Sequence, residues 1–176
     1  MPISKKLLKI LIDNKVKHEI IKHKKVFTAY DAAATLKVKL NTIAKSLLIK
    51  MNKSLEHGQK PYAIAMVPAD KNIDLKKLAK VMTTKDTRIT KVEIPKEAAM
   101  KVHFKVKPGT MGAFGSLYKL SVFVDKSLKG AIIFTSGDFT ESIKMNIADF
   151  IKLENAKTGN FSVAKKIKKS VVKKKK

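Results

Sequence analysis

Short apolar runs of strand length, set at uneven distances along the chain, constrain the fold more than any other feature. Runs of this length bounded by turn signals are typical of strands. Helical patterns separate some of the runs, but the last three follow one another without a helix between them. The order therefore predicts an α+β domain (mixed α/β) with a curled, barrel-like mixed sheet and flanking helices. The predicted strands are His18–Lys22, Ser46–Lys50, Tyr62–Val67, Leu120–Val124, Ala131–Thr135 and Ser142–Met145.

Helix signals lie before and between these strands. Apolar residues recur at helical spacing over residues 4–14, which predicts an amphipathic helix. Thr28 and Asp31 match a capping box at the start of a small helix, and Asn146 and Asp149 repeat that pattern near residue 147. Further helical turns are expected to begin at Asn41, Asp74 and Pro95.

Lys45 is the most informative residue for function. It precedes the apolar run Ser46–Ile49, so its neighbours hold it in place and its ammonium must find a partner or water. Two turns rich in backbone groups can converge on it, the glycine-spaced loop Gly109–Gly115 and the turn Ser136-Gly137-Asp138. A fixed cation facing such turns predicts a site for a phosphate-bearing ligand. The residues alone leave a structural lysine and an ordinary turn as the alternatives.

The charge balance is strongly basic. Against 14 Asp and Glu stand 39 Lys and Arg, which gives a formal net charge of +25. Arg88 is the single arginine, and lysine is poor at reading base edges. The charge therefore favours attraction to a nucleic-acid backbone over sequence readout. A lysine-rich proteome, in which most of these lysines are simply solvated, is the alternative explanation.

The length and the hydrophobic content predict one domain with a substantial core. The chain has 176 residues, of which 44% are hydrophobic. We expect this domain over residues 1–153. Residues 154–176 are expected to form a mobile basic tail that attracts RNA or aids solubility, because its many lysines repel one another. Neither a signal-peptide pattern nor a run of about 20 apolar residues is found, which predicts a cytoplasmic protein without a membrane partner.

Several kinds of chemistry find no support in the residues. The chain lacks cysteine, which removes disulfides, thiolate nucleophiles and cysteine zinc sites. The loop Gly109–Gly115 is neither a P-loop nor a dinucleotide fingerprint, because no Gly-Lys-Ser/Thr follows it. No serine has a histidine and an acid at recognisable positions. Neither a metal nor another cofactor is expected, because metal-ligand spacing is missing between His18, His23, His57 and His103.

Several short motifs follow one another in a recognisable order. They are His23, Val26-Phe27-Thr28-Ala29, Ala44-Lys45-Ser46-Leu47, Val67-Pro68-Ala69-Asp70, Leu75-Lys76-Lys77-Leu78-Ala79, Pro108-Gly109 through Phe114-Gly115, Val124-Asp125-Lys126-Ser127-Leu128 and Ser136-Gly137. Together they resemble the YbaK/prolyl-tRNA synthetase-associated domain family of aminoacyl-tRNA deacylases. Each motif alone is weak, but the resemblance spans about residues 4–153.

The resemblance implies an editing enzyme. Such a protein hydrolyses the ester between a wrong small amino acid and the 3′-terminal adenosine of tRNA, and this chain would do so in trans because it is too short to hold a synthetase. Lys45 would engage the terminal adenosine and its phosphate, and backbone groups of the glycine turns would hold the amino acid. The resemblance assigns catalysis to Lys45, Gly109 and Gly137, and substrate binding to Val26, Phe27, Thr28, Ser46, Gly112, Ala113, Ser136 and Asp138.

One position departs from the family pattern. Ala113 stands where the family usually has proline. Proline fixes φ and lowers the entropy lost when a loop is ordered, so alanine predicts a looser loop. Drifted specificity and reduced activity are both consistent with that change. The amino acid removed also stays open among alanine, serine, threonine, cysteine and proline.

Two other functions remain open at this point. One is a non-catalytic RNA- or ribosome-associated protein on the same scaffold, which Ala113 and the basic tail favour. The other is attachment to an anionic membrane through Leu7, Leu8 and Leu11 of the first helix together with the tail. The expected partner is the aminoacylated 3′ end of tRNA, with a synthetase or the ribosome as further candidates.

Overall fold

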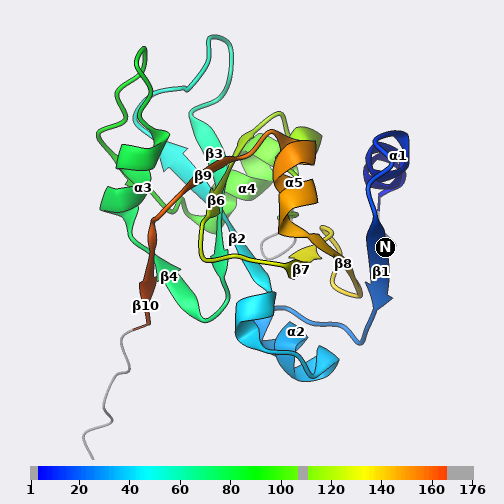
Figure 1. The fold of residues 1–176 in the computed structure, drawn as a ribbon. Coiled ribbons are helices and arrows are strands. Elements are labelled where there is room, and N and C mark those ends of the chain that lie inside the picture. The colour runs from blue at the N-terminus through cyan, green and yellow to red at the C-terminus, as the bar shows by residue number, and fades with distance from the viewer. Residues whose placement is uncertain (1–3, 107–110, 166–176) are drawn as a thin grey trace, which may run out of the picture.

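The computed structural model describes residues 4–106 and 111–165 (Figure 1). The α-helices among these residues are α1 (Lys5–Asp13), α2 (Ala29–Leu36), α3 (Leu75–Met82), α4 (Glu97–Phe104) and α5 (Ile147–Glu154), and short 3₁₀ turns are η1 (Leu40–Thr42) and η2 (Gly115–Leu117). The strands are β1 (His18–Lys22), β2 (Ala44–Met51), β3 (Tyr62–Pro68), β4 (Lys71–Ile73), β5 (Val92–Glu93), β6 (Ser121–Asp125), β7 (Ala131–Thr135), β8 (Glu141–Asn146), β9 (Lys157–Gly159) and β10 (Ser162–Ala164).

The helix starts follow the capping pattern of the sequence. The capping box of α2 is complete, because the Thr28 hydroxyl accepts from the Asp31 amide and the Asp31 carboxylate accepts from the Thr28 amide. Asp74 accepts from the first free amides of α3, and Asn146 does the same for α5. These caps satisfy backbone donors that have no partner inside the helix, so each helix begins where its cap stands.

The strands form a mixed arrangement rather than the single curled sheet that the sequence predicts. In the described residues the orders are β5-β2-β3-β6-β9, β1-β8-β7 and β10-β4. The β3–β6 and β6–β9 pairs are parallel, whereas β2–β3 is antiparallel. The α+β prediction is confirmed, but the barrel-like closure is not seen. Ile43, just before β2, meets Ile133 of β7 at an isolated parallel bridge, and a hydrophobic cluster packs between the larger sheet and β7–β8.

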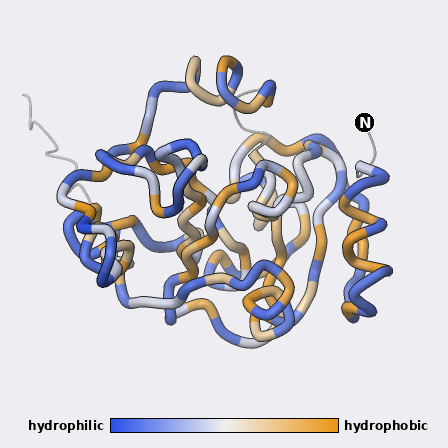
Figure 2. Tube along the Cα trace, turned by 90° about the horizontal axis from the view of Figure 1, so that it is seen from above, coloured by the Kyte–Doolittle hydropathy of each residue, from blue (hydrophilic) through white to orange (hydrophobic). Residues whose placement is uncertain are grey.

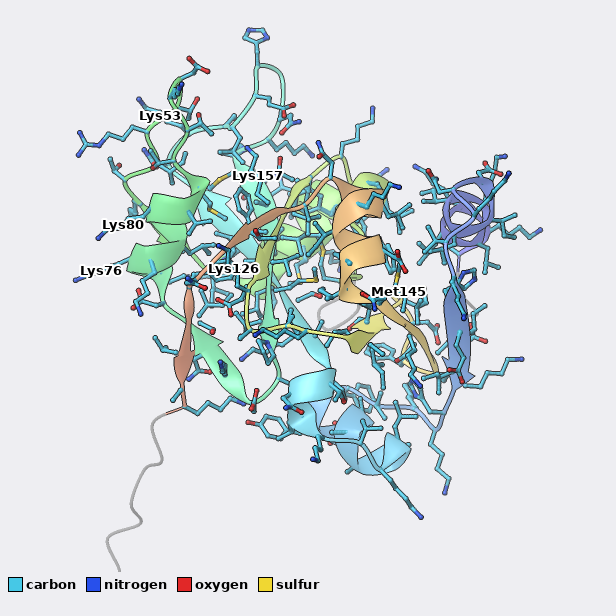
Figure 3. The ribbon with its side chains drawn as sticks, in the orientation of Figure 1. Lys53, Lys76, Lys80, Lys126, Met145 and Lys157 are labelled. Carbon is cyan, nitrogen blue, oxygen red and sulfur yellow. The ribbon has the colours of Figure 1, made fainter. Side chains whose placement is uncertain are left out.

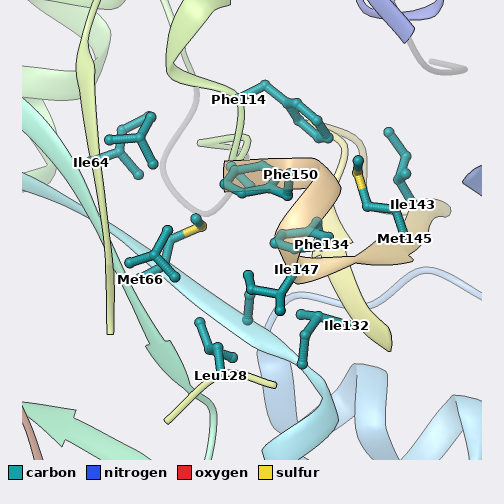
Figure 4. Close-up of a cluster of buried hydrophobic side chains, with 14 of the residues drawn as sticks. Ile64, Met66, Phe114, Leu128, Ile132, Phe134, Ile143, Met145, Ile147 and Phe150 are labelled. Carbon is teal, nitrogen blue, oxygen red and sulfur yellow. The ribbon is translucent and has the colours of Figure 1, made fainter. Parts of the chain in front are cut away.

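A cluster of aromatic rings occupies that space (Figure 4). Phe134 of β7 stacks on Phe150 of α5 with ring centroids 4.4 Å apart, and Phe114 meets Phe150 edge-on at 5.3 Å. Side chains from β3 and β6 reach the same cluster, while α3 covers the other face of the larger sheet. All of β3 is therefore buried, which holds β2 beside it in a fixed register.

The first helix packs against the body of the protein. Leu7 and Leu11 are fully buried, and the helix shows one hydrophobic and one hydrophilic side in Figure 2. Burying such leucines removes them from any lipid contact, so the proposed use of this helix as a membrane anchor loses its basis. Within the part of the chain that is described, no helix is long and apolar enough to cross a bilayer.

The C-terminal segment differs from the mobile tail predicted from residue 154. Residues 157–164 form β9 and β10, and the Phe161 side chain is fully buried. The Asp125 carboxylate, itself only 2% exposed, accepts from the backbone N–H groups of Phe161 and Ser162 at 2.7 Å each. This carboxylate ties the segment to the sheet edge, so the lysine-rich composition was a poor guide up to residue 165. The rest of the predicted tail lies outside the described residues.

Candidate active site

A cavity of about 430 Å³ opens between the start of β2, the first turn of α2 and the β7–β8 connection. Its wall is mostly apolar and is built from residues within 26–32, 43–47 and 133–142, with Met100 and Met111. Ligand sites of this size, with few polar groups in an apolar wall, are common in enzymes. The structure therefore brings together the predicted residues Val26, Phe27, Thr28, Lys45, Ser46 and Asp138.

Lys45 is held at the cavity by the start of strand β4. Its Nζ donates to the Lys71 carbonyl oxygen at 2.6 Å and to Asn72 Oδ1 at 3.4 Å. Burial lowers the pKa of Lys45 below its usual range, and the Asp70 carboxylate opposes that shift by favouring the ammonium. An ammonium has three donors, so among the described residues one N–H of Lys45 is left for a ligand.

Ser46 presents a buried hydroxyl beside this lysine. Ser46 is one of the residues that line the cavity, and no partner for its buried Oγ exists among the described residues. A buried hydroxyl without a partner is uncommon because it has lost its water contacts. A polar group of a bound ligand would restore such a hydrogen bond.

The segment Val26-Phe27-Thr28 forms one wall of the cavity, as the resemblance implies. The capping box of α2 fixes Thr28, and the Phe27 ring lies against Phe139 with centroids 5.1 Å apart. Lys25 Nζ stands over both rings. The Phe27 side chain is 61% exposed, so this wall extends to the rim of the cavity.

The two glycine turns lie next to each other. Gly137 has φ of +93°, a value that favours glycine, and a Cβ on Gly112 would lie 3.4 Å from the Gly137 nitrogen. Ser136 uses its hydroxyl within its own turn, donating to the Glu141 carbonyl oxygen at 2.6 Å. Gly109 lies outside the described residues. Gly112 therefore lies next to Ser136 and Gly137. Convergence of the two turns on Lys45 is seen only for Met111 and Asp138, which line the cavity, whereas Gly112, Ala113, Ser136 and Gly137 are not among its lining residues.

Burial and a backbone hydrogen bond hold Ala113 in place, although this position lacks the proline that is usual in the family. Its side chain is fully buried, and its N–H donates to the Thr135 carbonyl oxygen at 3.1 Å. Proline has no N–H and could not make this bond. At this position the alanine therefore replaces a fixed φ with a hydrogen bond to β7.

Beside the cavity, His23 contacts Ser142, a pair that the sequence does not bring together; Ser142 lines the cavity and His23 does not. His23 Nε2 is 2.9 Å from Ser142 Oγ, and His23 Nδ1 is 2.8 Å from the Lys24 carbonyl oxygen. A carbonyl only accepts, so Nδ1 carries the proton and Nε2 can accept the Ser142 hydroxyl proton. These residues are 119 positions apart, so local spacing gave no signal of their contact.

No cluster of three or more His, Cys, Asp or Glu that could hold a metal ion occurs in the described ranges. The polar groups of the site are thus an ammonium, hydroxyls, one carboxylate and backbone atoms. Such a set can bind a phosphate and orient an ester or amide carbonyl.

Comparison with protein families decides the classification. A model of the aminoacyl-tRNA editing domain matches residues 23–153, well over half of the chain. The chain belongs to the aminoacyl-tRNA editing domain family. The resemblance to the YbaK/prolyl-tRNA synthetase-associated proteins is thereby confirmed. The matched segment contains every site residue predicted from the sequence, and β9 and β10 lie beyond it. A comparison with curated protein sequences gives no significant match.

Solved structures share the fold at low sequence identity. The hypothetical protein APE2540 has a TM-score of 0.77 at 14% identity, over 90% of this chain and all of that one. A protein proposed to be a trans-editing enzyme for prolyl tRNA synthetase has a TM-score of 0.75 at 14% identity, over 93% of this chain and 99% of that one.

A third structure shows the same fold inside a longer protein. It is a proposed signal transduction protein from Marinobacter aquaeolei VT8, with a TM-score of 0.63 at 15% identity over 89% of this chain and 30% of that one. Likeness at this identity shows the fold alone, so substrate and activity must be argued from the site.

Proposed function

We propose that this editing-domain protein is an aminoacyl-tRNA deacylase, which removes a mischarged small amino acid from tRNA in trans. The observation that carries the proposal is the half-buried Lys45 ammonium at the wall of a largely apolar cavity, in a member of the editing family. The cavity offers an apolar wall to a small side chain and an ammonium to a phosphate.

The substrate is oriented by groups at opposite sides of the cavity. Lys45 holds the phosphate of the terminal adenosine with its remaining N–H, and Ser46 donates or accepts beside it. Val26 and Phe27 limit the size of the amino acid side chain. Backbone groups near Gly112 and Gly137, with Ser136 and Asp138 around them, hold the aminoacyl group, and Gly109 is proposed to extend that cradle. Fixing both parts of the ester is itself a large source of rate.

The reaction needs no protein nucleophile, because an aminoacyl ester is already activated. Water adds to the ester carbonyl carbon and passes its proton to a neighbouring ribose hydroxyl, which releases its own proton at the same time. The bond from carbon to the ribose oxygen then breaks, and a proton returns to that oxygen. Backbone donors near the carbonyl oxygen stabilise the charge that develops there, and losing one such donor typically costs about 10²–10³ in rate.

Binding of RNA without catalysis is the second candidate. The net charge of +25 favours it, since capture of a phosphate backbone would by itself explain the charge. Part of this charge lies around α3, where Figure 3 shows Lys76, Lys80 and Lys126 on the same side of the molecule. A cytoplasmic site of action and contacts with a synthetase or the ribosome belong to either proposal.

A panel of aminoacyl-tRNAs tests the proposal. Alanine, serine, threonine, cysteine and proline esters, each on a matching and a mismatched tRNA, are incubated with the wild-type protein and with Lys45→Ala. Loss of one mismatched ester that depends on Lys45 identifies the substrate and supports deacylation. Binding of tRNA without hydrolysis of any ester would establish the second candidate instead.

A further inference from the structure

A second lysine reaches the turn next to the strand residues that hold Lys45. Strand β10 pairs with β4 so that Ala164 lies opposite Lys71, and the next residue, Lys165, is carried to the β3–β4 turn. Lys165 Nζ donates to the Ala69 carbonyl oxygen at 2.6 Å and to the Tyr30 hydroxyl, and it stands 4.1 Å from the centroid of the Tyr30 ring. The anchor of β10 at Asp125 keeps this lysine in place.

The two ammonium groups share one short segment of backbone. Lys45 is bound to the Lys71 carbonyl and Lys165 to the Ala69 carbonyl, two residues apart. The carboxylate nearby is Asp70, which raises the pKa of Lys45 against the effect of burial. Among the ion pairs closer than 4.0 Å in the described residues, neither lysine takes part. The segment therefore carries more positive than negative charge.

Both cations retain capacity for an anion. Lys165, like Lys45, has two acceptors among the described residues, which leaves one N–H of its three. Tyr30 is half exposed and lines the cavity, so Lys165 stands at the cavity rim while Lys45 lies in its wall. An anion with repeated charged groups, such as an RNA strand entering the cavity, would meet first Lys165 and then Lys45.

We propose that Lys165 is a second phosphate contact for the RNA strand whose 3′ end enters the cavity. The proposal rests on the proposed function: Lys45 binds the phosphate of the terminal nucleotide, and Lys165 binds the phosphodiester before it. Lys165 lies beyond the segment that matches the family model, so this contact is a feature of this chain's own C-terminal strand. Tyr30 positions the ammonium through its hydroxyl and its ring.

Binding of uncharged tRNA tests this contact without any need for hydrolysis. Dissociation constants are measured from low to moderate salt for intact tRNA and for tRNA that lacks its last three nucleotides. Lys165→Ala is expected to weaken binding of intact tRNA about fivefold and to reduce the log–log salt slope by about 0.7, the value for one phosphate of a single strand. Binding of the truncated tRNA should not change.

Lys157→Ala is the matched control. It removes the same charge from β9 of the same segment, at a position that Figure 3 shows well away from α2. Its effect should be equal on intact and truncated tRNA. The proposal is overturned if Lys165→Ala has no effect, or if it weakens both tRNAs equally as a general loss of charge would.

Two further variants protect the test from a folding artefact. Lys165→Gln keeps an N–H for the Ala69 carbonyl but removes the charge, so it decides the outcome if Lys165→Ala lowers the melting temperature. Tyr30→Phe keeps the ring and removes the hydroxyl, and we expect about a twofold loss on intact tRNA only. If no ester is hydrolysed but Lys165 still matters for the intact 3′ end, the proposed function fails and this contact stands. If esters are hydrolysed and Lys165→Ala binds as wild type does, only this contact fails.

Discussion

The two ends of strand β2 each carry a lysine, and the two lysines have different surroundings. Lys45 is half-buried, its pKa is lowered by burial, and its nearest acceptor is a backbone carbonyl. Lys50 is 47% exposed and lies 3.6 Å from the Glu93 carboxylate. The cavity at the Lys45 end measures about 430 Å³, whereas the one at the Lys50 end measures about 150 Å³.

The difference comes from what the rest of the chain brings to each end. At Lys45 the α2 helix, the β3–β4 turn and the β7–β8 connection gather from distant parts of the sequence. At Lys50 the two-residue strand β5 pairs with β2 and offers an opposite charge in solvent. A surface ion pair contributes little, typically below about 1 kcal/mol. The half-buried Lys45 ammonium forms none of the ion pairs within 4.0 Å among the described residues, so it keeps capacity for an anion.

The largest expected effect is the difference in activity between Lys45→Ala and Lys50→Ala. Lys45→Ala should lower kcat/KM for hydrolysis of the aminoacyl ester by about 100-fold or more, because it removes the group that positions the substrate phosphate. Lys50→Ala should stay within about twofold of wild type, because the Lys50 ammonium forms an ion pair with Glu93 near the surface, away from the larger cavity. Steady-state deacylation measures both. Equal losses in the two variants would abolish the distinction between the ends of β2.

The next effect is expected on stability, at the Asp125 carboxylate that anchors β10. Asp125→Asn should lower the free energy of unfolding by about 2 kcal/mol, because it removes the charge that several buried donors share. Denaturant titration measures the change. Asp86→Asn, a change at an exposed acid, should leave stability within about 0.5 kcal/mol of wild type.

The loss of stability in Asp125→Asn should also depend on pH. Burial alone would raise the pKa of Asp125, but hydrogen bonds from Ser127, Phe161 and Ser162 bring it below its usual range. A carboxyl with a lowered pKa stabilises the fold above its unfolded-state pKa, about 3.9, and that stabilisation is lost as the pH falls through the folded-state value. The difference between wild type and Asp125→Asn should therefore be constant near neutral pH and shrink in acid. A constant difference down to strongly acidic pH would contradict this account.

A smaller effect is expected at Ser46, beside Lys45. Ser46→Ala removes a buried hydroxyl that has no partner among the described residues, so stability should stay equal or rise by about 1 kcal/mol. If the hydroxyl binds substrate, kcat/KM falls about fivefold. Ser54→Ala should give the reverse pattern, because the Ser54 hydroxyl donates to the Gln59 carbonyl at 2.7 Å far from the cavity. A less stable but fully active Ser46→Ala would remove Ser46 from the site.

The smallest effect is expected at Ser142. If water is the nucleophile, Ser142→Ala lowers kcat/KM by less than about threefold despite the contact with His23. A loss of about 100-fold, together with an acyl group trapped on the wild-type protein in a rapid quench, would show that Ser142 attacks the ester. The mechanism would then be covalent, with His23 as the base.

Elements with strong local signals were predictable from the sequence. The spans of β1 and β7 match their predicted ranges, and α1 and the capping box of α2 stand where their patterns place them. These features depend on residues within a few positions of each other, so a short window contains the cause. The 3₁₀ turn near Asn41 instead begins after Lys39, with the Thr42 hydroxyl donating to the Lys39 carbonyl.

Features set by distant contacts were not predictable in the same way. Strands β9 and β10 are only three residues long each, and they exist because Asp125 and the core bind Phe161 and Ser162. The pairs His23–Ser142 and Tyr30–Lys165 join residues more than 100 positions apart. Lys45 was found because an unusual residue stands at the mouth of an apolar strand, a signal that is itself local. Its partners, Lys71 and Asn72, carried no comparable signal.

The most direct test of the account is to see where an unreactive substrate analogue binds. An amide analogue of 3′-alanyl-adenosine 5′-phosphate, in which nitrogen replaces the ester oxygen, can be titrated into the labelled protein while backbone amide signals are followed by NMR. We expect the shifts to gather at Ala44–Ser46 and in residues 26–30, with Lys50–Asn52 unchanged. If saturating analogue shifts signals only at the Lys50 end, or at neither end, the claim that the Lys45 end of β2 is the active site is contradicted.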